Sequence, residues 1–125
     1  MLIALLTILF LGGGADTAVL DTISDTRKLV KTVVVDDERR KEVTSTLKAM
    51  KKRTSAYGKS TKKIAKRIAG ALAEHDASEV GINAAWADYF AMTDAYNNDL
   101  IELRFELKEQ LTREEWRELF SQPQE

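Results

Sequence analysis

The sequence predicts an all-α protein: a long antiparallel helical hairpin, similar to a coiled coil, with a short third helix at its C-terminal end. The chain of 125 residues is 44% hydrophobic and 31% charged, with six glycines and one proline. This composition is too apolar for a disordered chain and too poor in turn-forming residues for a loop-rich β fold. Two long segments also carry apolar residues in alternating steps of three and four, the heptad pattern of packed helices. We therefore expect one helical domain over residues 16–120.

An apolar run occupies residues 2–11 and is interrupted only by Thr7. With the small residues after it, this run would form a helix of roughly 15–21 Å, shorter than the ~30 Å hydrocarbon core of a bilayer. Its length is typical of the hydrophobic region of a signal peptide, and the small residues 13–15 would allow cleavage, although no lysine or arginine precedes the run. We expect residues 1–15 to be a signal peptide or a short membrane anchor. A buried apolar arm of a soluble protein is the alternative.

The first arm of the hairpin is predicted over residues 16–73, which contain no proline and are rich in helix-forming residues. A seam of apolar and small residues follows its second half: Val43, Leu47, Met50, Thr54, Tyr57, Thr61, Ile64, Ile68 and Ala71. An upstream stripe of Leu20, Ile23, Val30 and Val34 does not join this register. The mismatch falls at the charged residues 36–40, where we expect the seam to rotate or the helix to bend.

A polar turn is predicted at residues 74–78, between the two arms. Asp76 or Ser78 can cap the following helix, and Asp76 with Glu79 has the spacing of a capping box. The second helix is expected to run to about Gln110. Its seam repeats the same steps: Ile82, Trp86, Tyr89, Thr93, Tyr96, Leu100, Leu103 and Leu107.

A second capping box, formed by Thr112 and Glu115, predicts that a short third helix begins there. The apolar residues of this helix would be Trp116, Leu119 and Phe120. The polar residues 121–125 are expected to form a flexible tail.

The two seams fit each other when the chain folds at His75 and the helices run in opposite directions. Every tyrosine and tryptophan of the seams then faces a smaller residue, an arrangement that fills a core without voids. The predicted layers are Leu47/Leu103, Met50/Leu100, Thr54/Tyr96, Tyr57/Thr93, Thr61/Tyr89, Ile64/Trp86 and Ile68/Ile82. We therefore interpret these aromatic residues as core and not as a ligand site.

The first arm is longer than the second, because Asp16–Glu42 has no partner within the hairpin. As a helix, this stretch would extend roughly 40 Å and expose its own apolar stripe. The third helix can cover only part of it. We therefore expect a second copy of the chain to cover the rest in a homodimer, and a solvated stalk that frays is the alternative.

Charge is divided between the two arms. Residues 27–67 hold 15 basic and 4 acidic residues, a net charge of +11, whereas residues 74–125 hold 4 basic and 13 acidic residues, a net charge of −9. Between Lys48 and Arg67 there are nine basic residues and no acidic one. Arg53 and Arg67 flank the seam, and Arg53 can approach Asp99 on the other arm. Attraction between the arms is otherwise long range, because surface ion pairs contribute only ~0–1 kcal/mol each.

Most lysines of this stretch fall on outward positions of the heptad. They are the candidate partner-binding residues: Lys48, Lys52, Lys59, Lys62, Lys63 and Lys66. Such a face can bind an acidic protein partner or an anionic membrane surface, and a merely solvated face is the alternative. Nucleic acid is not favoured as a partner, because no aromatic residues interleave with the lysines and the acidic arm would repel phosphate.

The residue types argue against catalysis. The chain has no cysteine, which excludes a disulfide scaffold, a zinc finger, an iron–sulfur site and a thiol nucleophile. The chain has one histidine, His75, so a metal site built from several histidines of one chain is excluded. We expect His75 to be solvated in the turn. A metal site shared between two copies of the chain is the alternative. No glycine-rich phosphate loop or nucleophile elbow is present. We expect no catalytic residue, no resident metal and no cofactor.

A motif near the C-terminus resembles a known family. In residues 103–116, Leu111 and Thr112 followed by Glu114 match the ending Leu-Thr-Pro-Glu-Gln, with Arg113 in place of the proline and Glu115 in place of the glutamine. This segment resembles the LTxxQ-motif periplasmic helical-hairpin proteins, which include Spy/CpxP-type chaperones and CnrX-like membrane-anchored metal-resistance sensors.

The resemblance implies an N-terminal signal or anchor followed by a hairpin of long helices that dimerises. The chaperone branch uses a concave basic and apolar surface, for which the stretch from Lys48 to Arg67 would serve. The metal-sensor branch binds its ion with several histidines plus Glu and Met. This chain has only His75, so that role is not carried over.

The expected function is that of a non-catalytic, membrane-tethered or exported helical interaction protein, a sensor, adaptor or chaperone-like partner. The alternative is a structural coiled-coil protein facing the cytosol, whose basic helix binds an anionic membrane or an acidic partner. Orientation stays open. Arg27, Lys28 and Lys31 after the apolar run favour a cytosolic body, whereas the signal-like run and the motif favour a periplasmic or other extracytoplasmic, membrane-associated location.

Overall fold

The computed structural model of the protein describes residues 14–120. These residues form four helices and no strand: α2 (Gly14–Val33), α3 (Asp37–Ala73), α4 (Glu79–Gln110) and α5 (Arg113–Phe120). The predicted all-α fold is therefore confirmed. Residues 1–13, which make up nearly all of the predicted signal or anchor, and the predicted tail of residues 121–125 lie outside the described residues.

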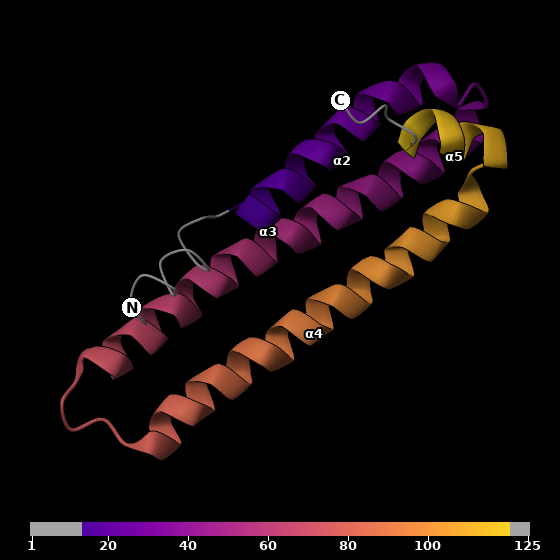
Figure 1. Ribbon diagram of the computed structural model, residues 1–125. Coiled ribbons are helices and arrows are strands. Elements are labelled where there is room, and N and C mark those ends of the chain that lie inside the picture. Colours follow the sequence, from indigo (N-terminus) through magenta and orange to yellow (C-terminus); the bar gives the residue numbers. More distant parts are fainter. Residues whose placement is uncertain (1–13, 121–125) are drawn as a thin grey trace.

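Helices α3 and α4 form the predicted hairpin and lie side by side along most of their length (Figure 1). Their contacts run in opposite order along the chain, with Thr54 bonded to Tyr96 and Tyr57 bonded to Thr93. The turn falls where the sequence predicts it, between Ala73 and Glu79. Ser78 and not Asp76 caps α4, since the Ser78 hydroxyl accepts a hydrogen bond of 3.0 Å from the Gly81 amide.

The prediction of one long first arm is wrong. Helix α2 ends at Val33, the chain reverses through residues 34–36, and α2 lies back along α3 (Figure 1). Asp36 starts α3 by accepting a hydrogen bond of 2.9 Å from the Arg39 amide. Arg40 donates to the carbonyls of Val34 and Val35 at 3.3 and 3.5 Å, and so satisfies acceptors at the end of α2. At residues 36–40 we expected the seam to rotate or the helix to bend, but Asp36 and Arg40 instead cap two separate helices.

The main core lies where α2, α3, α5 and the end of α4 meet. Its buried members are Ile23, Val30, Val34, Val43, Leu47, Leu107, Leu111 and Leu119. The apolar stripe of α2, which predicted a second copy of the chain, is therefore covered by α3 and α5 within the same chain. That stripe gives no ground for a homodimer.

The far end of the hairpin has a smaller core built from α3 and α4. Ile68 and Ala85 are buried there, and the partly buried residues packed on them are Ile64, Leu72, Trp86 and Tyr89. The two cores are thus arranged one after the other along α3.

Between the two cores lies a layer of tyrosines and threonines. Hydrogen bonds join the hydroxyls of Thr54 and Tyr96 at 2.9 Å and those of Tyr57 and Thr93 at 3.1 Å. The rings of Tyr57 and Tyr96 stack with their centroids 4.1 Å apart. These contacts confirm two of the predicted layers. They also explain why threonines can occupy seam positions, since each hydroxyl has a partner there.

Candidate functional site

The six predicted lysines all lie exposed on α3. At 3.6 residues per turn they project, together with Lys51, within about a third of the circumference of the helix. Thr54 and Tyr57, which bond to α4, lie on the other side of α3. The lysines therefore form one stripe that faces away from the hairpin partner. We call the residues Lys48, Lys52, Lys59, Lys62, Lys63 and Lys66 the lysine face.

Two arginines at the margin of this face are engaged by the acidic arm. The Arg53 side chain donates to the Asp99 carboxylate at 2.5 Å, as the sequence predicts. Arg67 donates to Asp88 at 2.7 Å. Within residues 14–120, none of the lysines of the face forms an ion pair. The two arginines thus bridge the arms, while the charge of the lysine face is left for solvent or a partner.

The lysine face also carries like charges close together. Lys48 and Lys52 are four residues apart, and the same spacing joins Lys59 to Lys63 and Lys62 to Lys66. Such pairs are neighbours on a helix surface and destabilise it by about 0.2–0.5 kcal/mol each. A bound anionic surface would relieve this repulsion.

A shallow groove of about 340 Å³ lies between α2 and α3 at the near end of the lysine face. The residues that line it are Lys31, Arg40, Lys41, Thr44, Ser45 and Lys48. Four of these carry positive charge and none carries negative charge. Arg40 is held by Asp37 and by the carbonyls at the end of α2. The groove therefore extends the positive surface from Lys48 towards α2.

A second basic groove was not foreseen from the sequence. It lies between the end of α4 and α5, has a volume of about 300 Å³, and is lined by Arg104, Lys108, Leu111, Thr112, Arg113, Trp116 and Arg117. These include all four basic residues of the region 74–125. The Arg104 guanidinium lies 5.0 Å from the centre of the Trp116 ring, within the range of a cation–π contact.

The four cations of the second groove are spread over two helices within a region of net charge −9. Because acidic residues outnumber them there, the sequence alone gives no positively charged stretch that would indicate this groove. The available signal was the spacing of four residues between Arg104 and Lys108 and again between Arg113 and Arg117. Such spacing places two cations on one face of each helix.

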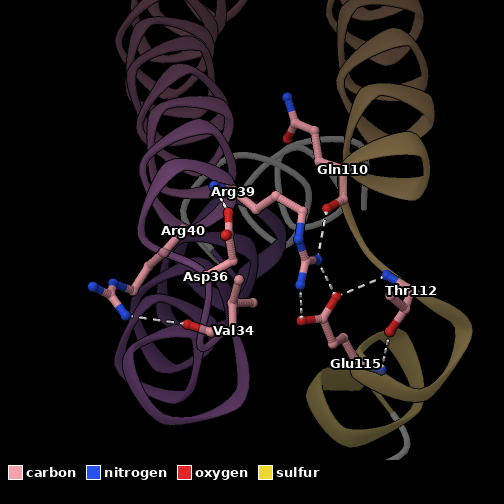
Figure 2. Close-up of polar contacts among 7 residues, drawn as sticks. All are labelled: Val34, Asp36, Arg39, Arg40, Gln110, Thr112 and Glu115. Atoms are coloured by element: carbon pink, nitrogen blue, oxygen red, sulfur yellow. Dashed lines mark hydrogen bonds and ion pairs between the residues drawn. The ribbon is translucent and has the colours of Figure 1, made fainter.

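Helix α5 is fixed in place by a cluster of polar contacts around Glu115 (Figure 2). The Glu115 carboxylate accepts hydrogen bonds from Arg39, at 3.0 Å for Nη2 to Oε2, and from the Thr112 amide at 2.8 Å. The Thr112 hydroxyl accepts in return from the Glu115 amide at 3.1 Å, which confirms the predicted capping box. Arg39 also donates to the Gln110 carbonyl at 3.4 Å. One arginine of α3 therefore joins the end of α4 to the start of α5.

The same contacts shift the acid–base behaviour of the two charged residues. The hydrogen bond from Arg39 has the largest effect and lowers the pKa of Glu115 below its usual value. Burial raises this pKa by a smaller amount, and the hydrogen bonds with Thr112 lower it further. The hydrogen bond to Glu115 correspondingly raises the pKa of Arg39. Both groups are therefore held in their charged forms, as a structural contact requires.

Residues 14–120 contain no group of three or more His, Asp or Glu side chains placed to hold a metal ion. His75 is almost fully exposed in the turn, where its Nδ1 atom lies 2.9 Å from Asp76. Across the same stretch of chain, no helix has the length and apolar character needed to cross a membrane.

Comparisons with protein-family models, with curated proteins and with solved structures found no match to this chain. The resemblance of residues 103–116 to the LTxxQ-motif proteins therefore rests on the motif alone.

Proposed function

We propose that this chain is a non-catalytic helical interaction protein, membrane-tethered or exported, which binds an acidic protein partner through its lysine face and acts as a sensor, adaptor or chaperone-like component. The observation that carries the proposal is the contrast within α3. The arginines at the margin pair with Asp99 and Asp88, whereas the lysines of the face are exposed and repel one another.

The shape of the lysine face suits an elongated acidic partner. From Lys48 to Lys66 the face extends for roughly 27 Å along one helix. The underlying helix is held straight against α4 by buried layers such as Thr54 with Tyr96, so the charges are positioned before a partner arrives. Positive charge arranged in this way favours fast, salt-sensitive association with an acidic helix or an extended acidic segment.

Reversing four charges of the face is expected to weaken binding of an acidic polypeptide by about tenfold or more. The variant carries Lys59→Glu, Lys62→Glu, Lys63→Glu and Lys66→Glu. Each exposed charge pair contributes ~0.2–1 kcal/mol, and reversal replaces each attraction with a repulsion of similar size at all four positions. Fluorescence anisotropy of labelled poly-L-glutamate, measured over a range of salt concentrations, gives the affinity.

The matched control reverses four cations that lie outside the lysine face and its adjoining groove and are not buried: Arg27, Lys28, Arg113 and Arg117. It has the same net charge as the first variant and should lose less than about threefold in affinity, because these cations make no close pair with the bound polypeptide and only screened long-range attraction is lost. Equal losses in both variants would contradict a defined lysine face. Loss of binding to phosphatidylglycerol vesicles, with poly-L-glutamate binding unchanged, would favour the membrane-surface alternative.

The proposed location outside the cytosol can be tested with a single cysteine. The chain has no cysteine of its own, and Ser45 is exposed at the groove between α2 and α3. A Ser45→Cys variant is expected to react with a membrane-impermeant maleimide in intact cells, because the signal-like residues 2–11 would carry the hairpin across the membrane. If labelling occurs only after lysis, the hairpin lies in the cytosol and the export part of the proposal fails.

A further inference from the structure

The outer face of α4 carries a second heptad seam in addition to the one that packs on α3. Its positions follow in alternating steps of four and three: Val80, Ala84, Ala87, Ala91, Asp94, Asn98, Ile101, Phe105 and Lys108. All of these residues are exposed. Helix α4 is therefore apolar on two opposite sides, which is typical of a helix that is covered on both.

The large apolar members of this outer seam are among the most exposed large hydrophobic side chains of the described residues. Val80 is 79% exposed, Ile101 53% and Phe105 51%. Large apolar side chains at regular helical spacing mark an interaction surface more strongly than scattered ones do. Within residues 14–120, α4 packs mainly against α3, which leaves this side of α4 uncovered.

We propose that the outer seam is the interface of an antiparallel homodimer, in which α4 packs on α4 of a second copy about a two-fold axis beside Ala95. In this register Phe105 packs on the partner's Ala87 and Ile101 packs on the partner's Ala91. The small alanines leave room for the large side chains, as a close-packed core requires. The two-fold axis repeats each layer, so the interface is self-complementary.

The polar residues of the seam fit the same register. Asp94 meets the partner's Asn98, whose amide can donate to the carboxylate. In a parallel pair Asp94 would instead face the partner's Asp94, and Lys108 would face the partner's Lys108. A parallel pair would also place phenylalanine on phenylalanine and alanine on alanine, which gives crowded layers next to empty ones. Charge and size therefore both favour the antiparallel arrangement.

The flanking positions add one favourable and one unfavourable contact. Arg104, whose guanidinium already lies 5.0 Å from the Trp116 ring of its own chain, approaches the partner's Phe90, which is 58% exposed in the single chain and can accept a cation–π contact. Asp88 approaches the partner's Glu102, but Asp88 is already paired with Arg67 of its own chain at 2.7 Å. The lysine faces lie on the sides of the two α3 helices that are turned away from α4, so the homodimer leaves both of them accessible. The interface does not depend on the proposed function.

Sedimentation velocity of the full chain should show a dimer. The Ile101→Glu substitution should weaken self-association by at least about tenfold, because the two-fold axis places one uncompensated charge from each copy in the interface. The matched control Ala69→Glu adds the same charge at an exposed position of α3 and should leave the dimer unchanged. Circular dichroism of both variants should match that of the parent chain, because both positions are exposed.

Cross-linking through single cysteines tests the orientation. Ala95→Cys lies beside the proposed axis, whereas the two copies of Ala84→Cys would lie roughly 36 Å apart at 1.5 Å per residue. A short bis-maleimide should therefore link two copies of the Ala95→Cys variant and not two copies of the Ala84→Cys variant.

Several outcomes would overturn the proposal. Equal cross-linking of both cysteine variants would indicate a parallel pair. A dimer that persists in the Ile101→Glu variant would place the interface elsewhere in the chain. A monomeric parent chain would exclude the homodimer, and in that case binding to phospholipid vesicles that is lost in Ile101→Glu would assign the seam to a lipid surface. None of these outcomes changes the poly-L-glutamate test of the lysine face.

Discussion

Replacement of Leu47 by alanine is expected to lower the free energy of unfolding by about 2–5 kcal/mol. The Leu47 side chain is 2% exposed and belongs to the core in which α2, α3, α5 and the end of α4 meet. Truncation removes buried apolar contacts and leaves a cavity that helices on several sides cannot all close at once. Because α2 and α5 are held mainly by this core, the loss should fall on the docking of both.

Urea denaturation followed by circular dichroism, at one fixed protein concentration, measures this change. Val35→Ala is the matched control, since Val35 also loses methyl groups but is 81% exposed. The control should stay within about 0.5 kcal/mol of the parent chain. If Leu47→Ala also stays within that range, the core does not close around Leu47 as described.

Thr54→Val is expected to destabilise the protein by about 1–3 kcal/mol, although valine has nearly the shape of threonine. Thr54 is fully buried and Tyr96 is 6% exposed, and their hydroxyls share a hydrogen bond of 2.9 Å. The substitution removes one partner and leaves the Tyr96 hydroxyl buried without it. The cost is therefore the desolvation of an unpaired polar group, and not a loss of volume.

A double-mutant cycle separates this explanation from simple crowding. The variant Thr54→Val with Tyr96→Phe removes both hydroxyls and should recover about 1 kcal/mol or more of the loss seen in Thr54→Val alone. The pair Tyr57 and Thr93 is the control, because it is only partly buried and should give a smaller coupling. Strictly additive losses at Thr54 and Tyr96 would show that their hydrogen bond does not contribute.

The hairpin could be predicted because its information is local and repetitive. Two heptad seams fix which side of each helix is buried, and the sizes of their residues fix which positions face each other. Thr54 with Tyr96 and Tyr57 with Thr93 were predicted on this basis and are bonded in the structure. The capping box of Thr112 and Glu115 was predicted for the same reason, since both partners lie within four residues.

The chain reversal at residues 34–36 could not be predicted in the same way. No glycine or proline marks it, and Val33, Val34 and Val35 do not by themselves stop a helix. The reversal depends on tertiary contacts: Val34 is fully buried in the main core, and Arg40 bonds back to the end of α2. The local signal was the acidic group at residues 36–38, which is typical of a helix start but was interpreted as a rotation of the seam or a bend in one helix.

Of the two positively charged surfaces, one could be predicted from local sequence and the other depends on tertiary contacts. Exposure of the lysine face follows from its heptad positions, so the sequence was sufficient to predict it. The groove around Trp116 brings Arg104 and Lys108 of α4 next to Arg113 and Arg117 of α5. That meeting depends on how α5 docks, which no spacing within either helix determines.

The arrangement of the two cores along α3 has a consequence for local opening. At one end α3 is buried in a core formed with α2, α5 and α4, and at the other end the described core is formed with α4 alone. Amide hydrogen exchange should therefore be slowest around Leu47 and become faster towards Ile68, because each segment opens at a free energy set by the contacts it must break. The lysine face spans both regimes, from Lys48 near the protected end to Lys66 near the labile end. A partner bound along the whole lysine face would add contacts to the labile half. Binding should therefore slow amide exchange most in the half of α3 near Lys66.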